Sequence, residues 1–259
     1  MSALTVFKAL MLRNFVYLKR TGVEVFSIIF WPVIIMSSLA FFATFIQSKE
    51  GLVILVTGSI AWSYMFTSHV DTSYTFVRDI WHRSLKKLRM LPIPEWQLII
   101  GNWLFGLFRS AAMIAITSTI AFFVFGFNLF SINLLYLFAV FFGLSLFGMG
   151  IGIIISSAIL RYGVNAEVLI WSVADALILL SGVFFPVSVL PPVLQFVSYG
   201  LPPTYGLEGL RGAFIHGAYD WVMIAKFYIA DLIYIGIFWI VLKAQMRHSL
   251  RTGFFQKYE

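Results

Sequence analysis

Ionisable side chains interrupt the long apolar runs of this sequence, and they are the first candidates for chemistry: Asp71, Arg109, Asp175, Lys226 and Asp231. A charge in hydrocarbon is costly, so it serves an ion or proton pathway, or it is neutralised by partners inside the protein. The acids do not recur at four-residue spacing within one run. This favours ion pairs or hydrogen bonds within a helix bundle, with a proton relay as the alternative. We predict Asp175 and Asp231 near the middle of the membrane and Asp71 near its cytoplasmic surface.

Signatures of catalysis are missing from the sequence. There is no GxxxxGK[ST] phosphate-binding loop, and the four histidines are not clustered with acids at the spacing of a metal or hydrolytic site. Cysteine is absent, which excludes thiolate metal sites and a cysteine nucleophile. We therefore predict that this chain has no catalytic residues, metal or cofactor. A membrane-embedded enzyme that acts on lipids is a weak alternative for the same reason.

Composition places these residues in a membrane protein. Hydrophobic residues make up 61% of the chain and charged residues 11%, and the mean hydropathy is +0.93. A helix needs about 20 apolar residues to span roughly 30 Å of hydrocarbon. Such runs predict an all-α polytopic protein with six transmembrane helices in a single domain, over Val23–Ile46, Leu52–Thr75, Trp96–Phe125, Leu134–Ile159, Val168–Phe185 and Trp221–Leu242.

The basic residues are distributed unevenly between these runs, and Lys and Arg accumulate on the cytoplasmic side of membrane helices. With the N-terminus inside, only Lys49 and Arg211 fall in outer segments, and Arg109 and Lys226 fall within runs. Both termini are therefore predicted in the cytoplasm, in a cell membrane whose anionic inner leaflet, rather than nucleic acid, explains the pI near 9.7. The inner segments hold fourteen of the 18 basic residues: Lys8, Arg13, Lys19, Arg20, Arg78, Arg83, Lys86, Lys87, Arg89, Arg161, Lys243, Arg247, Arg251 and Lys257.

Two segments outside the runs have amphipathic patterns. Residues 1–20 combine one apolar sector with a basic one, which predicts an interfacial helix on the cytoplasmic leaflet, with a basic leader that only sets the topology as the alternative. Residues 80–91 predict a short cytoplasmic helix that Pro92 and Pro94 end. Its apolar stripe argues against a basic loop that only retains charge inside. The residues assigned to this helix are Trp81, Arg83, Leu85, Lys86, Lys87, Leu88 and Arg89.

Small residues recur at every fourth position in the fourth run, at Gly148, Gly152 and Ser156. This spacing lets two membrane helices approach closely. The glycines do not form a nucleotide-binding loop, because no strand precedes them and they lie in hydrocarbon. We therefore predict a helix-packing surface here.

Five of the eight prolines fall between Phe184 and Gly212, in the segment FFPVSVLPPVLQFVSYGLPPTYGLEGLRG. Prolines prevent one continuous helix, and irregular charged backbone is tolerated at membrane depth only when protein or an aqueous cavity surrounds it. Two short re-entrant helices over residues 186–212, entering from the outer face, satisfy both requirements. Glu208 and Arg211 share one helical face and can pair with each other or across a subunit interface. The alternative is an outer loop in which each charge is solvated.

The segment SGVFFPVSVLPPVLQFVSYGLPPTYGLEGLRG resembles the C-terminal hallmark of type-2 ABC exporter permeases. That family shows an SG-x-x-F-P motif, which Ser181, Gly182, Phe185 and Pro186 fit. Its P-x-T-Y-x-x-E-x-x-R signature is matched by Pro202, Thr204, Tyr205, Glu208 and Arg211. The segment SLKKLRMLPIPEWQLIIG is similar to the family's coupling-helix region, although Lys86 and Lys87 stand where members often carry a glutamate.

The resemblance implies the membrane subunit of an ABC exporter, in which two copies of this chain or close paralogues flank a path and dock on separate ATPase subunits that bind ATP and Mg. It also implies that the re-entrant helices close the exit, with Phe185, Pro186, Phe196, Pro202, Tyr205, Glu208 and Arg211 as gate residues. The aromatic content favours an amphipathic cargo such as a lipid-linked glycan, lipid, drug or peptide. The alternative function is a secondary transporter or channel driven by an ion gradient, with Asp175, Asp231 and Arg109 as working residues.

Overall fold

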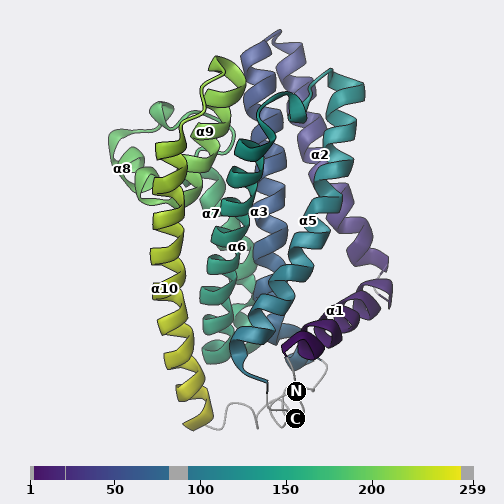
Figure 1. Ribbon diagram of the computed structural model, residues 1–259, viewed down its shortest axis with the longest axis vertical. Helices are drawn as coiled ribbons and strands as arrows, with labels where there is room; N and C mark the ends of the chain where they lie inside the picture. Colours follow the sequence, from purple (N-terminus) through teal and green to yellow (C-terminus); the bar gives the residue numbers. More distant parts are fainter. Residues whose placement is uncertain (1–2, 21, 82–92, 252–259) are drawn as a thin grey trace.

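The computed structural model describes residues 3–20, 22–81 and 93–251, and within these ranges the secondary structure is helical (Figure 1). Nine α-helices and three short 3-10 helices follow one another along these ranges. Their bounds are α1 Ala3–Arg20, α2 Gly22–Phe45, α3 Lys49–Trp81, α5 Glu95–Phe125, η1 Leu129–Ser131, α6 Leu134–Tyr162, η2 Gly163–Glu167, α7 Val168–Leu180, η3 Val187–Val189, α8 Pro192–Gly200, α9 Pro202–His216 and α10 Trp221–Arg251.

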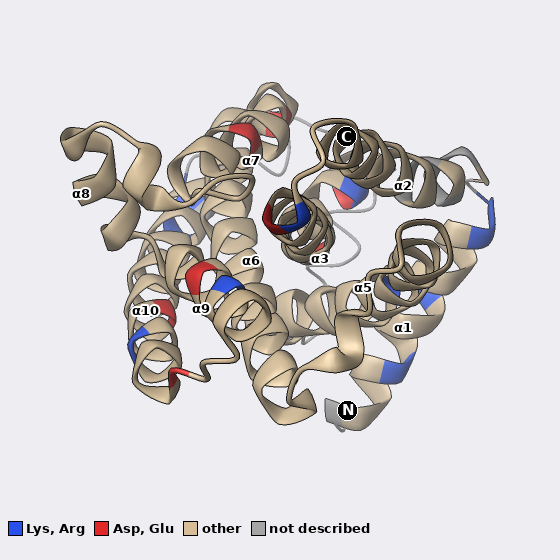
Figure 2. Cartoon of the chain, turned by 90° about the horizontal axis from the view of Figure 1, so that it is seen from above, with Lys and Arg blue, Asp and Glu red and all other residues tan. Residues whose placement is uncertain are grey.

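Helix α3 is the centre of the bundle, with α2, α5, α6 and α7 placed around it (Figure 2). Its side chains are buried almost without interruption from Val56 to Ile80, although many of them are Ser, Thr, His or Asp. A helix surrounded by helices in a membrane turns its polar groups toward protein, where they find hydrogen-bond partners. Ser68, for example, donates to the carbonyl oxygen of Ser145 on α6 at 2.9 Å. Polarity along α3 therefore marks the inside of the bundle.

The predicted small-residue surface is confirmed at the crossing of α3 and α6. A Cβ atom added to Gly148 would lie 2.7 Å from the carbonyl oxygen of Met65, and one added to Gly152 would lie 2.3 Å from Thr72. One turn further along α6, the hydroxyl of Ser156 donates to the Thr72 carbonyl oxygen at 3.3 Å. The backbones of the two helices therefore lie too close together for larger side chains.

Replacing Gly152 with alanine is expected to lower the stability of the protein, because α3 backbone and the Thr72 side chain occupy the space of the new methyl group. Overpacking of this kind costs about 1 to 3 kcal/mol. Gly236 is the matched control, since it is an exposed helical glycine of α10 with no atom within 4 Å of an added Cβ. Thermal unfolding in detergent should show a loss for Gly152→Ala and none for Gly236→Ala; equal behaviour of the two variants would contradict the close approach.

Each predicted transmembrane run coincides with a helix over most of its length, but the helices differ in length. Four stretches of the described chain are long and apolar enough to cross a membrane: Lys49–Trp81, Glu95–Phe125, Leu134–Leu180 and Trp221–Ser249. Helix α7 has 13 residues, about 20 Å at 1.5 Å per residue. It ends at Leu180, five residues before the predicted limit, because Gly182 adopts a left-handed conformation with φ 62°. The count of six spans stays a prediction.

The proline-rich segment forms two short helices, α8 and α9, that meet at Leu201 (Figure 1). Pro192 begins α8, and Pro202 and Pro203 occupy the first turn of α9, where a missing backbone N–H is tolerated. The predicted break into two helices is therefore confirmed. Entry of this pair into the membrane from the outer face stays a prediction.

Candidate functional site

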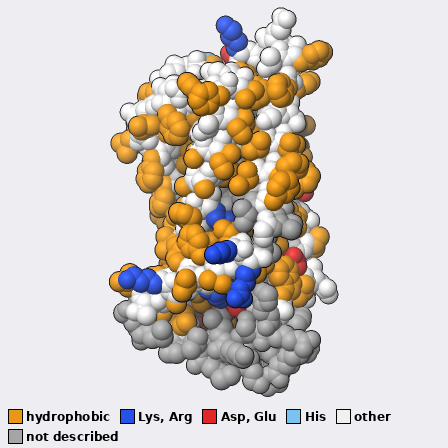
Figure 3. All heavy atoms as spheres, turned by 90° about the vertical axis from the view of Figure 1, so that its right-hand side faces the viewer, with side chains coloured by type: hydrophobic (Ala, Val, Ile, Leu, Met, Phe, Trp, Pro, Cys, Tyr) orange, Lys and Arg blue, Asp and Glu red, His pale blue; other side chains and the backbone are white. Residues whose placement is uncertain are grey.

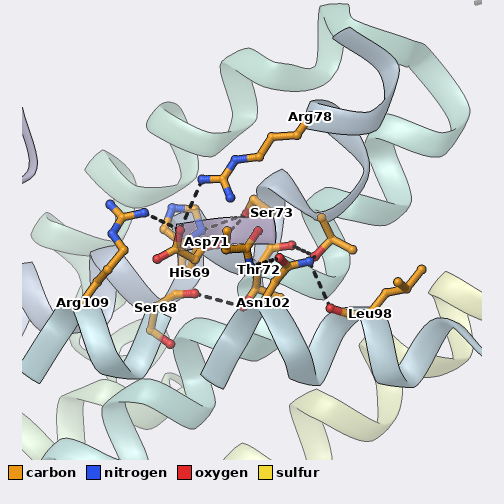
Figure 4. A network of polar contacts seen from close by, with 11 residues as sticks. Ser68, His69, Asp71, Thr72, Ser73, Arg78, Leu98, Asn102 and Arg109 are labelled. Carbon is orange, nitrogen blue, oxygen red and sulfur yellow. Dashed lines mark hydrogen bonds and ion pairs between the residues drawn. The ribbon is translucent and has the colours of Figure 1, made fainter. Parts of the chain in front are cut away.

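Asp71 of α3 is the centre of a buried charge cluster between α3 and α5 (Figure 4). Its Oδ1 atom accepts a hydrogen bond from Arg109 of α5 at 2.5 Å and one from Arg78, two turns along α3, at 3.4 Å. The Asp71 side chain is 0% exposed and both arginine side chains are 8% exposed. The prediction that intramembrane charges pair within the bundle is confirmed for Asp71 and Arg109.

The cluster holds two cations for one carboxylate, and aromatic faces lie next to both cations. The Arg78 guanidinium lies 4.7 Å from the ring centroid of Tyr17 and 5.5 Å from that of Tyr74, and the Arg109 guanidinium lies 5.9 Å from that of Phe105. Cation–π contacts of this kind gain strength when water is excluded. Among the described residues, Asp71 is the carboxylate that accepts from both arginines, and the cluster therefore depends on it.

Polar contacts extend from the cluster to the N-terminal helix α1. Arg13 of α1 pairs with Asp79 of α3 at 3.2 Å. Asn14 donates to the Asn102 side-chain oxygen at 2.8 Å, and Asn102 donates to Thr75 at 3.1 Å. Together with Tyr17 over Arg78, these contacts join α1, α3 and α5 into one polar unit. Sequence reasoning did not find Arg13, Asn14, Asp79 or Asn102, because their partners lie far away along the chain.

The face of α1 that packs on the bundle overlaps the apolar sector of its sequence only in part. Val6, Leu10 and Asn14, each one turn apart, are the buried residues, whereas Leu4 and Phe15 are 64% and 43% exposed. An interfacial helix has two apolar neighbours, the protein and the lipid, so its hydrophobic pattern does not indicate which side faces protein. Pairing of Asn14 with Asn102 favours the observed face.

The other intramembrane acids do not join this cluster. Asp175 lies on the exposed side of α7, and Asp231 of α10 is completely buried. Neither carboxylate oxygen of Asp231 has a hydrogen-bond partner among the described residues, so the predicted pairing is wrong for Asp231 within that part of the chain. Lys226 is exposed on α10.

The predicted coupling helix lies mostly outside the described residues. Arg83, Leu85, Lys86, Lys87, Leu88 and Arg89 fall in the 82–92 gap. Trp81, the last residue of α3, is 43% exposed, and its ring lies 5.5 Å from that of Tyr74. The two helices that flank the gap, α3 and α5, are the ones that the Asp71 cluster joins.

Glu208 and Arg211 of α9 pair with each other and hold the turn that follows α7. Their side chains meet at 2.9 Å, which confirms the intramolecular alternative. Arg211 also donates to the carbonyl oxygens of Gly182 and Val183, and Glu208 accepts from the backbone N–H of Val187 at 2.9 Å. Arg211 is 5% exposed, so the alternative of a solvated loop charge is wrong for this residue.

Other residues assigned to the exit gate occupy different environments. Pro202 is buried, Phe185 and Pro186 are half-buried, and Phe196 of α8 is 84% exposed. The Tyr205 hydroxyl donates to the carbonyl oxygen of Tyr199 at 2.7 Å, which joins α9 to α8. These contacts make α8, α9 and the turn after α7 one connected unit at the opposite side of the bundle from α1 (Figure 1).

Four helical stretches of membrane-spanning length among the described residues, together with a polar central helix and a proline-broken helix pair, are typical of a multi-pass membrane protein. Residues 5–215 match the family described as ABC-2 type transporter, and the chain belongs to that family. It is therefore a membrane subunit of an ABC transporter rather than a catalytic subunit. A comparison with curated proteins found no match.

Proposed function

We propose that this chain is the permease of an ATP-driven exporter, in which a separate ATPase subunit with ATP and Mg docks on residues 80–91. The observation that carries this proposal is the position of the Asp71 cluster, which ties α1 to the two helices flanking that segment. A push on the segment would move α1, α3 and α5 together, since bonds within a buried cluster resist separation. The cluster thereby transmits the conformational movement of the ATPase subunit to the helix bundle.

The exposed side of α7 supports the proposal that a translocation path, or a second copy of the chain, lies next to this helix. It carries Val168, Trp171 and Asp175, and Trp171 is 51% exposed. A carboxylate in contact with lipid tails is costly, so Asp175 is expected to face another subunit or an aqueous path. Exposed aromatic residues on the same bundle, such as Trp31 and Phe41 at 60% and 59%, suit an amphipathic cargo.

The coupling proposal predicts that the purified chain alone hydrolyses no ATP, and that an affinity-tagged chain retains its ATPase when purified from its native membrane. Leu85→Asp with Leu88→Asp should release that ATPase, because the charges abolish an apolar contact. Lys49→Asp, at the opposite end of α3, is the control and should retain it. ATPase activity in the eluate is the measurement, and full retention by the double variant would refute the docking site.

The orientation proposal places both termini in the cytoplasm. In Figure 3, Lys and Arg side chains gather toward the end of the molecule where α1 lies, and hydrophobic side chains cover the middle of the face. The absence of natural cysteine permits a clean test. A cysteine at His216 should react with an impermeant thiol reagent added to intact cells, and one at Arg247 should not; both positions are exposed. Labelling of position 247 from outside would reverse the orientation.

A further inference from the structure

Asp231 of α10 is a buried acid that is not neutralised by a partner among the described residues. It is 0% exposed, and neither carboxylate oxygen has a hydrogen-bond partner among the described residues. It lies ten residues after Trp221, the first residue of α10, which is about 15 Å along the helix and half of a hydrocarbon core of roughly 30 Å. Asp71 is equally buried but has two arginines.

Tight packing on both sides prevents the Asp231 side chain from reaching water. Helix α10 packs against α6 and α9. One turn before Asp231, the ring of Phe227 fills the space next to Gly143 of α6 and Gly206 of α9, 2.5 Å and 2.8 Å from where Cβ atoms would lie. One turn after it, Ile235 packs against Gly150 of α6, 3.3 Å from a Cβ at that glycine. The carboxyl group is therefore enclosed at a three-helix contact.

The ionisable groups of the neighbouring helices do not supply a countercharge. Arg161 is in the last turn of α6 and exposed, and on α9 Glu208 and Arg211 pair with each other while His216 is exposed. On α10 itself, Lys226 is exposed, and Lys243 pairs with Glu95. Tyr228 interacts electrostatically with Asp231, but its hydroxyl donates to the carbonyl oxygen of Ala139 at 2.8 Å. An ionised carboxylate here would have no compensation, and an uncompensated buried charge is strongly destabilising.

We propose that Asp231 is a proton-binding site inside the membrane, occupied as a neutral carboxylic acid while α6, α9 and α10 are packed together. Release of the proton leaves a carboxylate that requires water, so it requires α10 to separate from α6 or α9. Proton occupancy and the packing of α10 are therefore linked. Helix α9 also carries the Glu208–Arg211 pair, which binds the turn after α7. A movement of α9 that accompanies proton release therefore also moves that turn.

Modification by dicyclohexylcarbodiimide tests the protonation state, because this reagent reacts with protonated carboxyl groups in apolar surroundings. Membranes containing the full-length chain are treated at neutral pH, and the modified residue is located by peptide mass spectrometry. We expect modification at Asp231 and its loss in Asp231→Asn. Asp71 is the internal control, since it is equally buried but pairs with two arginines. An unmodified Asp231, or equal modification of Asp71, would overturn the proposal.

The pH dependence of stability gives a second, independent test that does not require reagent access. In the unfolded chain Asp231 releases its proton as the pH rises, whereas the packed state must keep it. Keeping the proton then becomes about tenfold less favourable for each further pH unit. The asparagine variant has no such proton. From about pH 5.5 to about pH 8, the thermal stability of Asp231→Asn in detergent should therefore rise steadily relative to wild type. A constant difference between Asp231→Asn and wild type across this range would refute the proton site.

Discussion

Asp71→Asn is expected to destabilise the protein by about 3 to 5 kcal/mol, because it leaves two buried arginines without their shared carboxylate. The asparagine has nearly the same shape, so the loss reports charge rather than packing. In practice, we expect a large fall in detergent-solubilised yield and in the thermal unfolding temperature. Glu50→Gln, at an exposed position in the first turn of α3, is the control and should change stability by no more than about 0.5 kcal/mol.

A second substitution separates the Asp71–Arg109 pair from the rest of the cluster. Arg109→Gln in the Asp71→Asn background removes the cation 2.5 Å from the lost carboxylate. The double variant should be more stable than Asp71→Asn alone, since one unpaired charge is no longer buried. If the stability losses of the single variants simply add in this double-mutant cycle, the two residues do not interact. The proposal that the cluster transmits motion would then lose its basis.

Arg211→Ala is expected to have an effect of similar size, about 3 to 5 kcal/mol, because it removes the partner of Glu208 together with the donors to two backbone carbonyls. Loss of these contacts frees the turn between α7 and α8 from α9. Yield, thermal unfolding and transport should all fall. Lys226→Ala, at an exposed position near the start of α10, is the control and should be nearly silent.

The charge-swapped pair Glu208→Arg with Arg211→Glu is expected not to recover. From the sequence, partial restoration follows, since the two charges would still attract each other. In the structure, Arg211 donates to Gly182 and Val183, and Glu208 accepts from the N–H of Val187. A carboxylate at position 211 cannot donate, and a guanidinium at position 208 cannot accept. Restoration by the swap would show that the backbone contacts are unimportant.

Several features of the chain follow from local sequence alone. The apolar runs predict the helices, because spanning length and composition are properties of a continuous segment. Gly148, Gly152 and Ser156 predict a close helix contact, since their spacing places them on one face whatever the partner is. The E-x-x-R spacing of Glu208 and Arg211 places them on one helical face and so allows the pair that the structure shows, although the sequence left pairing across a subunit interface open.

Tertiary structure alone determines which side chains meet between helices. Asp71 and Arg109 are 38 residues apart, and the sequence contains other acids and bases with equal claim to pair. Likewise, Asp71 and Asp231 are both acids in apolar runs, yet one has two cations beside it and the other none among the described residues. The physical reason is that lipid and protein interior are similarly apolar. Hydrophobic pattern thus fixes which segments are helices in the membrane, whereas packing of one helix on another decides which face turns inward and which charges are neutralised.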